Sequence, residues 1–187
     1  MKGLVSALGD SLTWGWPFGP EYSWARPAGR VKVLNFGQSG DTLGDMRGRV
    51  GQALEPGPDY LLVMGGTNDV FLGLSRARME ADLLAIAKEA EAAGAEVLLG
   101  LCPPALDGSE GLLAFWRARQ RELAVERGWR VIDFFSCLLD AAGAPVRELF
   151  LDECHLTKEG YSWLRRRFLK SLDELMPSLI DFPEEKH

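Results

Sequence analysis

The sequence has 187 residues, of which 47% are hydrophobic and 26% are charged, and its formal net charge is −6. This length fits one domain, and the composition excludes a largely disordered or low-complexity chain. The negative charge repels phosphate backbones and therefore disfavours a nucleic-acid partner. No run approaches the ~18 consecutive apolar residues that a membrane span needs, so we expect no transmembrane segment.

The cysteines and the first residues bear on the cellular compartment. Cys102, Cys137 and Cys154 form no CxxC pair, and three cysteines cannot all pair with one another. The N-terminus has one lysine and a brief apolar run, but it lacks the length and cleavage-site character of a secretory signal. Both features predict a reducing, cytoplasmic location. The sequence implies no metal and no organic cofactor.

Five short apolar runs, each followed by turn residues and a longer segment, predict the strands of a sheet. Each run is largely apolar rather than alternating, as expected for parallel strands that are covered on both faces. The runs are Gly3–Leu8, Val31–Phe36, Tyr60–Met64, Glu96–Leu101 and Arg130–Phe135.

Three longer segments have the apolar spacing or the terminal signals of helices. The first runs from an N-cap at Ser75 to Gly94, the second stops at Gly128 after Arg127, and the third follows an N-cap at Thr157. Because strands and helices alternate, we predict an α/β domain with a parallel sheet and right-handed crossovers. We place this single domain at residues 1–177 and a C-terminal tail at residues 178–187.

The residues that follow the strands carry the functional prediction, because open α/β sheets bind ligands at the carboxyl ends of their strands. The first three runs are followed by GDSL (9–12), by a glycine turn within NFGQSG (35–40) and by GGTND (65–69). A fourth segment, DECHL (152–156), precedes the last helix. We therefore expect a hydroxyl, two glycine turns, an amide and a carboxylate–imidazole pair at one edge of the sheet.

Ser11, His155 and Asp152 have the residue types of a nucleophile, a base and an orienting acid. A serine hydroxyl is a weak nucleophile and needs a base to accept its proton. His155 is the natural base, since the other histidine of the chain, His187, lies in the predicted tail. Asp152 precedes His155 by three positions, close enough for a turn to bring its carboxylate to the imidazole. The chain has no GxSxG motif, which separates it from the α/β-hydrolase arrangement.

The four segments, in this order, resemble the sequence blocks of the SGNH hydrolases, also called GDSL esterases and lipases. The string GDSLTWGW (9–16) is similar to the bacterial arylesterase branch, and the short chain is similar to the small thioesterase and lysophospholipase branch. The resemblance implies a three-layer α/β/α, flavodoxin-like fold whose five-stranded parallel sheet has the order 2-1-3-4-5. It also implies a serine esterase that acts on a small-molecule carboxylic or thio-ester through an acyl-Ser11 intermediate.

The resemblance further implies an oxyanion hole, which places hydrogen-bond donors where negative charge develops. Its donors would be the backbone N–H groups of Ser11 and Gly37 and the side-chain amide of Asn68. Trp14 and Trp16 follow the nucleophile and are candidates to line an acyl or aryl pocket, with sealing of the core as the alternative. The short connection from Ser11 to the second strand predicts a shallow site that prefers small acyl groups.

Taken singly, these residues also have structural interpretations. Ser11 could cap a helix, His155 could be a satisfied core or surface histidine, and Asp152 could be a helix N-terminal charge. Cys154 lacks a second cysteine at ligand spacing, so we interpret it as a residue without a chemical role rather than as a nucleophile or a metal ligand.

Three other functions stay open at this point. An acyltransferase or a carbohydrate deacetylase would use the same triad. A non-catalytic binding module on the same fold would be expected to lose Ser11, Asp152 or His155, and all three are present. A nucleotide- or flavin-binding protein is a weaker alternative, since neither GxGxxG nor GxxxxGK[ST] occurs. The sequence leaves the oligomeric state open, a homo-oligomer included.

Overall fold

A five-stranded sheet forms the centre of the computed structural model, which describes residues 3–177 and residue 179. All four pairings are parallel, and the strand order is β2-β1-β3-β4-β5. The strands are β1 (Leu4–Gly9), β2 (Lys32–Gly37), β3 (Tyr60–Met64), β4 (Glu96–Leu101) and β5 (Arg130–Asp133). The structure confirms the predicted α/β class and the order 2-1-3-4-5, and each predicted strand lies within two residues of the observed one.

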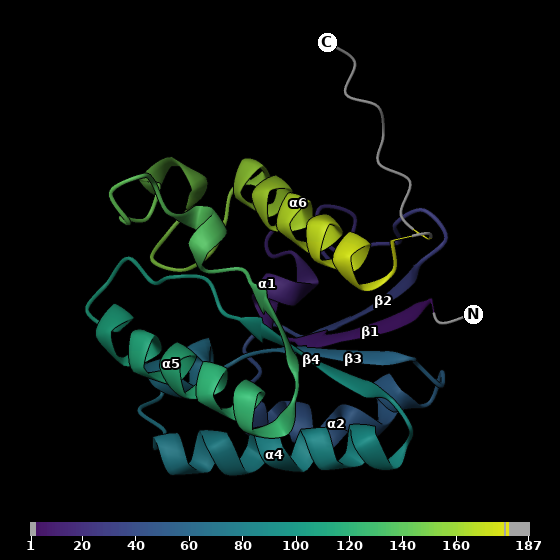
Figure 1. Ribbon diagram of the computed structural model, residues 1–187. Coiled ribbons are helices and arrows are strands. Elements are labelled where there is room, and N and C mark those ends of the chain that lie inside the picture. Colours follow the sequence, from purple (N-terminus) through teal and green to yellow (C-terminus); the bar gives the residue numbers. More distant parts are fainter. Residues whose placement is uncertain (1–2, 178, 180–187) are drawn as a thin grey trace.

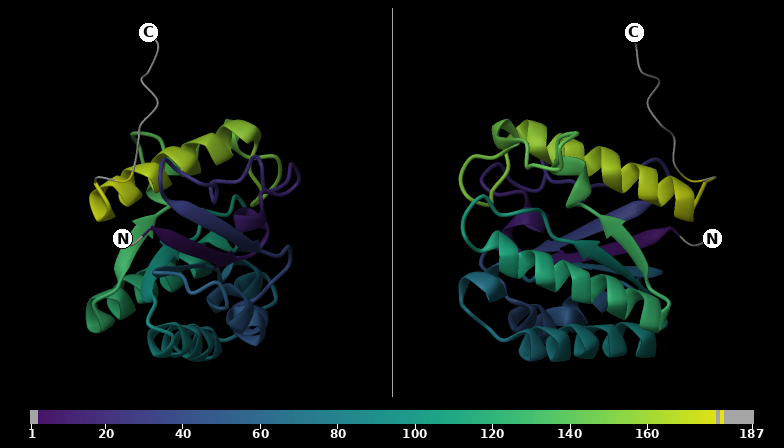
Figure 2. Two further views of the ribbon diagram at one scale, coloured as in Figure 1. Left: turned by 90° about the vertical axis from the view of Figure 1, so that its right-hand side faces the viewer. Right: turned by 60° about the vertical axis from the view of Figure 1, so that its left-hand side comes forward.

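Helices cover both faces of the sheet and give the protein three layers (Figures 1 and 2). Helix α6 (Lys158–Leu175) lies on one face and packs with Trp24 into one cluster of buried apolar side chains. A second cluster lies on the other face, beneath α2 (Leu43–Leu54), α4 (Arg76–Ala92) and α5 (Glu110–Arg127). The strands are thus buried on both sides, which explains their nearly continuous apolar sequence.

The predicted ends of the three long helices agree with the structure. The Ser75 side chain accepts the N–H of the third residue of α4, and the Thr157 side chain does the same for α6. Gly94 and Gly128 follow α4 and α5 with φ angles of +81° and +71°, a conformation that glycine adopts without strain. None of the helices within residues 3–177 combines the length and the apolar character needed to cross a bilayer.

Helix α2 is the long element that the sequence pattern did not predict. It contains Gly44, Gly48 and Gly51, each of which weakens a helix by about 1 kcal/mol relative to alanine. A capping box between Thr42 and Asp45 starts the helix, and burial of one face stabilises it. The buried residues of that face are Leu43, Met46, Val50 and Ala53.

Short helices occupy the remaining connections. Helices α1 (Ser11–Trp14) and α3 (Thr67–Phe71) follow β1 and β3 directly, and two 3₁₀ turns, η1 (Ser136–Leu138) and η2 (Arg147–Leu149), lie between β5 and α6. Both short α-helices therefore start at the carboxyl edge of the sheet. Two of the four predicted functional segments, GDSL (9–12) and GGTND (65–69), lie at these starts.

Leu179 is the described residue of the predicted tail. Its side chain is buried in the cluster beneath α6, and its carbonyl accepts the N–H of Arg30 at 2.9 Å. Residue 178 and residues 180–187, including His187, lie outside the described part of the chain. The division between domain and tail at residue 177 stays a prediction.

Candidate active site

Ser11 is the first residue of α1, immediately after the carboxyl end of β1. The residue that caps α1 is Asp10, whose side chain accepts the N–H of Leu12 at 2.9 Å. Asp10, and not Ser11, therefore satisfies the start of the helix. The Ser11 hydroxyl is left to make a contact elsewhere.

That contact is with His155, which lies 144 positions along the chain. The Ser11 Oγ and the His155 Nε2 are 3.1 Å apart, and the His155 Nδ1 lies 2.8 Å from the Asp152 Oδ2. This chain of contacts suits an imidazole that donates its Nδ1–H to the carboxylate and accepts a proton at Nε2. The structure thus brings together the three residues that the sequence predicted to meet.

A tight turn at Asp152 fixes the orientation of the imidazole. The Asp152 Oδ1 accepts the backbone N–H groups of Cys154 at 2.9 Å and of His155 at 2.7 Å, which leaves Oδ2 for the imidazole. Partial burial alone would raise the pKa of Asp152, but these two N–H groups and the imidazole together lower it to about 2. Asp152 is therefore ionised at neutral pH.

Asn68 approaches the same edge from the start of α3. Its side-chain Nδ2 donates to the Asp41 carbonyl at 2.9 Å, which uses one of the two amide hydrogens. Gly66 precedes α3 with a φ of +116°, and a Cβ there would lie 2.2 Å from the Trp116 Nε1. Only glycine therefore fits the turn that directs Asn68 toward the loop after β2.

The N–H of Gly37 is already hydrogen-bonded, whereas the expected role in the oxyanion hole requires a free donor. Its N–H donates to the Asn35 Oδ1 at 2.8 Å, and a Cβ at this position would lie 2.1 Å from the Trp14 backbone nitrogen. Glycine is needed here because β2 packs directly against α1, rather than because a substrate approaches. The structure does not bring the Gly37 N–H toward Ser11 as a free donor.

The two candidate pocket tryptophans differ in position. The Trp16 ring lies against the His155 ring, with a centroid separation of 4.3 Å and an interplanar angle of 43°. Its backbone carbonyl accepts the Tyr161 hydroxyl at 2.8 Å, and its side chain is exposed. Trp14 is the half-buried last residue of α1, and its backbone lies against Gly37 of β2. Trp16 therefore forms an aromatic wall beside the base.

Arg49 is a residue of the site that the sequence analysis missed. Its side chain donates to the Asp41 carboxylate at 2.5 Å, to the Phe36 carbonyl at 2.8 Å and to the Gly9 carbonyl at 2.9 Å. It thereby joins the ends of β1 and β2 to the loop that receives Asn68. A single arginine in an unpredicted helix carries no sequence signal for this role.

Two buried carboxyl groups lie beneath these loops. Burial, together with the nearby Asp41 and Asp69 carboxylates, raises the pKa of Asp10 to about 7, although the Leu12 N–H opposes the shift. Burial also raises the pKa of Asp69 to about 6, although its side chain accepts the Leu43 N–H at 3.0 Å. Asp69 thus connects the start of α3 to the start of α2.

Comparisons with known proteins bear on the family and the fold of the chain. Residues 7–163 match the model of the GDSL-like lipase/acylhydrolase family. The chain belongs to this family. It is accordingly a hydrolase that acts on esters. A search of curated proteins found no match.

Three solved structures have the same fold as this GDSL hydrolase. A lipolytic G-D-S-L family protein from Veillonella parvula is 21% identical, with a TM-score of 0.81 over 94% of this chain and 99% of that one. A G-D-S-L family protein from Desulfitobacterium hafniense is 24% identical, with a TM-score of 0.81 over 89% and 98%. The esterase EstA from a Pseudoalteromonas species, solved with monoethylphosphonate as inhibitor, is 20% identical, with a TM-score of 0.78 over 95% and 100%.

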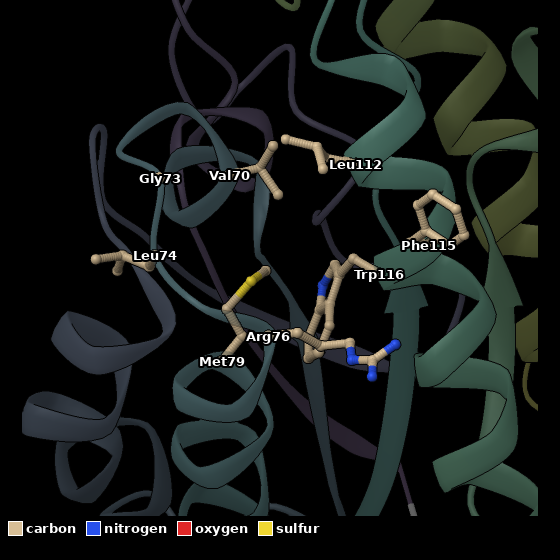
Figure 3. Close-up of a pocket in the computed structure, with 8 residues that line it drawn as sticks. All are labelled: Val70, Gly73, Leu74, Arg76, Met79, Leu112, Phe115 and Trp116. Atoms are coloured by element: carbon tan, nitrogen blue, oxygen red, sulfur yellow. The ribbon is translucent and has the colours of Figure 1, made fainter.

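An apolar pocket of 390 Å³ lies between α3, α4 and α5, and neither Ser11 nor Asn68 is among its lining residues. Figure 3 shows side chains of α5 facing those of α3 and α4 across this pocket. Leu112 and Phe115 of its lining are 60% and 68% exposed, so one side of the pocket is open. Its lining residues are Val70, Gly73, Leu74, Arg76, Met79, Leu112, Phe115 and Trp116.

Cys154 lies next to the base of this GDSL hydrolase. Its Sγ is 3.6 Å from the His155 Nδ1. Burial raises the pKa of the Cys154 thiol to about 12, and the Asp152 carboxylate adds to the shift. The thiol is therefore protonated at neutral pH, which disfavours a nucleophilic role.

Proposed function

We propose that this GDSL hydrolase is a serine esterase that cleaves carboxylic or thio-esters of small acyl groups through an acyl-Ser11 intermediate. The observation that carries the proposal is the pair of contacts from Ser11 to His155 (3.1 Å) and from His155 to Asp152 (2.8 Å). A hydroxyl at this distance from an imidazole nitrogen can transfer its proton as it attacks a carbonyl carbon.

The proposed reaction has two steps that use the same imidazole. First, the Ser11 Oγ attacks the ester carbonyl while the His155 Nε2 takes its proton, and His155 then passes this proton to the departing alcohol or thiol. Second, water attacks the acyl-Ser11 ester, gives a proton to His155, and Ser11 leaves with that proton. The ionised Asp152 stabilises the imidazolium that forms in each step.

For the oxyanion we propose the N–H of Ser11, the second amide hydrogen of Asn68 and the N–H of Gly40 in place of Gly37. The first N–H groups of a helix have no partner within it, so the Ser11 N–H is available. Gly40 is exposed with a φ of +86°, and a Cβ added there would meet no atom within 4 Å. It also precedes Asp41, whose carbonyl holds Asn68.

Two places in the structure are candidates to hold the acyl group, and they favour acyl groups of different length. The exposed Trp16 beside His155 supports a shallow site for a small acyl or aryl ester. The apolar pocket between α3 and α5 instead favours a longer acyl chain. Rates on p-nitrophenyl esters from acetyl to lauroyl separate the two, because only the second candidate predicts that Leu112→Asp slows long-chain esters and spares acetate.

The nucleophile is tested with Ser11→Ala and a matched control, Ser136→Ala, which removes an exposed hydroxyl far along the chain. We expect Ser11→Ala to fold normally, to lose about 10⁴–10⁶ in kcat and to escape labelling by a fluorophosphonate. The control Ser136→Ala should keep the wild-type kcat and should still be labelled by the fluorophosphonate. Wild-type rates in Ser11→Ala would refute the proposal, and sugar or alcohol acylation in product analysis would favour acyl transfer over hydrolysis.

A further inference from the structure

A sulfur, a carboxylate oxygen and an imidazole nitrogen lie close together at the Nδ1 edge of the His155 ring. Within the described residues, Asp152, Cys154 and His155 form one group whose ligand atoms all lie within 4.8 Å of one another. The Cys154 Sγ is 3.6 Å from the His155 Nδ1, and the Asp152 Oδ2 is 2.8 Å from the same nitrogen. The reaction proposed above uses the imidazole and the carboxylate but leaves the sulfur without a role.

These separations are close to those of a tetrahedral zinc site. Bond lengths of about 2.3 Å to sulfur and about 2.0 Å to nitrogen and oxygen, at tetrahedral angles, place sulfur about 3.5 Å and oxygen about 3.3 Å from the nitrogen. The observed sulfur–nitrogen separation already matches. The carboxylate must move by about half an ångström, and nearly half of the Asp152 side chain is exposed (44%), which leaves it room.

The backbone holds this loop in place without using the metal-ligand atoms. Both N–H groups of the turn donate to the Asp152 Oδ1, so neither of them occupies Oδ2, which contacts the imidazole. The His155 side chain is partly exposed at 23%, and Cys154 is half-buried, so an ion can approach from solvent. A thiolate, an imidazole and a carboxylate together suit zinc or cadmium better than the hard cations magnesium or calcium.

We infer that Asp152, Cys154 and His155 form an inhibitory site for a thiophilic divalent cation such as Zn²⁺, with water in the fourth position. The thiol proton is released to solvent as sulfur binds the metal. The metal also replaces the hydrogen on Nδ1, and the neutral imidazole then carries its one proton on Nε2. A protonated Nε2 cannot accept the Ser11 proton, so the ion switches off the base.

This inhibition rests on the proposed esterase function, whereas the binding of the ion does not. Binding is therefore measured first with Cd²⁺, whose bond to a thiolate gives an ultraviolet charge-transfer band. We expect the band in the wild type and in Cys137→Ala, which removes another partly buried thiol, and not in Cys154→Ala. Cys154→Ser serves as a second variant that keeps the size of the side chain.

Ester hydrolysis then tests the consequence. We expect Zn²⁺ to lower the wild-type rate at least about tenfold, EDTA to restore it, and Cys154→Ala or Cys154→Ser to need at least about tenfold more Zn²⁺ for the same effect. A cadmium band of full strength in both Cys154 variants would overturn the site. Equal zinc sensitivity of wild type and variants would overturn the inhibition. A band that depends on Cys154 in a protein without esterase activity would support the site and count against the proposed function alone.

Discussion

Replacing Arg49 with methionine tests whether one buried cation holds the loops of the site. The variant keeps an unbranched stem but removes the three donors that reach Asp41, Phe36 and Gly9. The side chains of Arg49 and Asp41 are only 12% and 5% exposed, so the carboxylate would stay buried without its partner. Breaking such a pair costs about 3–5 kcal/mol. We expect a loss near the lower value, about 3 kcal/mol, because burial already raises the pKa of Asp41 and protonation relieves part of the penalty.

Urea unfolding at pH 7 measures this loss, with Arg166→Met as the matched control. Arg166 pairs with Glu159 where both side chains are more than 60% exposed, so its removal should change the free energy of unfolding by less than about 1 kcal/mol. The Arg49 effect should shrink as the pH falls, since Asp41 then binds a proton in the folded variant. If the two variants were equally stable at pH 7, the view that Arg49 is the central support of these loops would be wrong.

Three further changes test other parts of the site. Asn68→Ala should lower kcat by about 10²–10³, and a loss of less than about threefold would exclude Asn68 as an oxyanion donor. Asp152→Asn should lower kcat by about 10⁴ without unfolding the protein, whereas near-normal turnover would show that the imidazole needs no carboxylate. Asp10→Asn tests a buried acid whose folded pKa of about 7 exceeds the ordinary value of 3.8. The stability from Asp10 is therefore present below about pH 4 and lost as the pH rises through 7. Relative to wild type, the variant should gain a few kcal/mol of stability between pH 4 and pH 8, and a constant offset across this range would contradict the burial argument.

The sheet could be predicted because burial on both faces leaves a strong pattern in the sequence. Each strand is a short apolar run, and the turns between the elements carry glycine, proline or a capping hydroxyl. Helix α2 escaped prediction because three glycines mask its apolar face. Its stability comes from tertiary packing and from the Thr42–Asp45 capping box, and only the capping box could have been found in the sequence.

The chemical groups of the site were predictable for a different reason. Ser11, Asp152 and His155 stand at strand ends or before a helix, and the chain has one histidine besides His155. The distances between these three side chains could not be predicted, since they depend on the loops that bring His155 back to Ser11. The role of Arg49 could not be predicted at all, because its three acceptors are brought together only by the fold.

The choice between Gly37 and Gly40 as the oxyanion donor could not be made from residue type. Both glycines lie in the same turn segment, and the sequence gives no reason to prefer one N–H over the other as a donor to substrate. The choice depends on peptide orientation. The Asn35 side chain accepts the Gly37 N–H and also donates to the Thr13 carbonyl, which ties β2 to α1. A donor already used to hold the scaffold cannot also be free for an oxyanion, so the next exposed glycine of the loop is the better candidate.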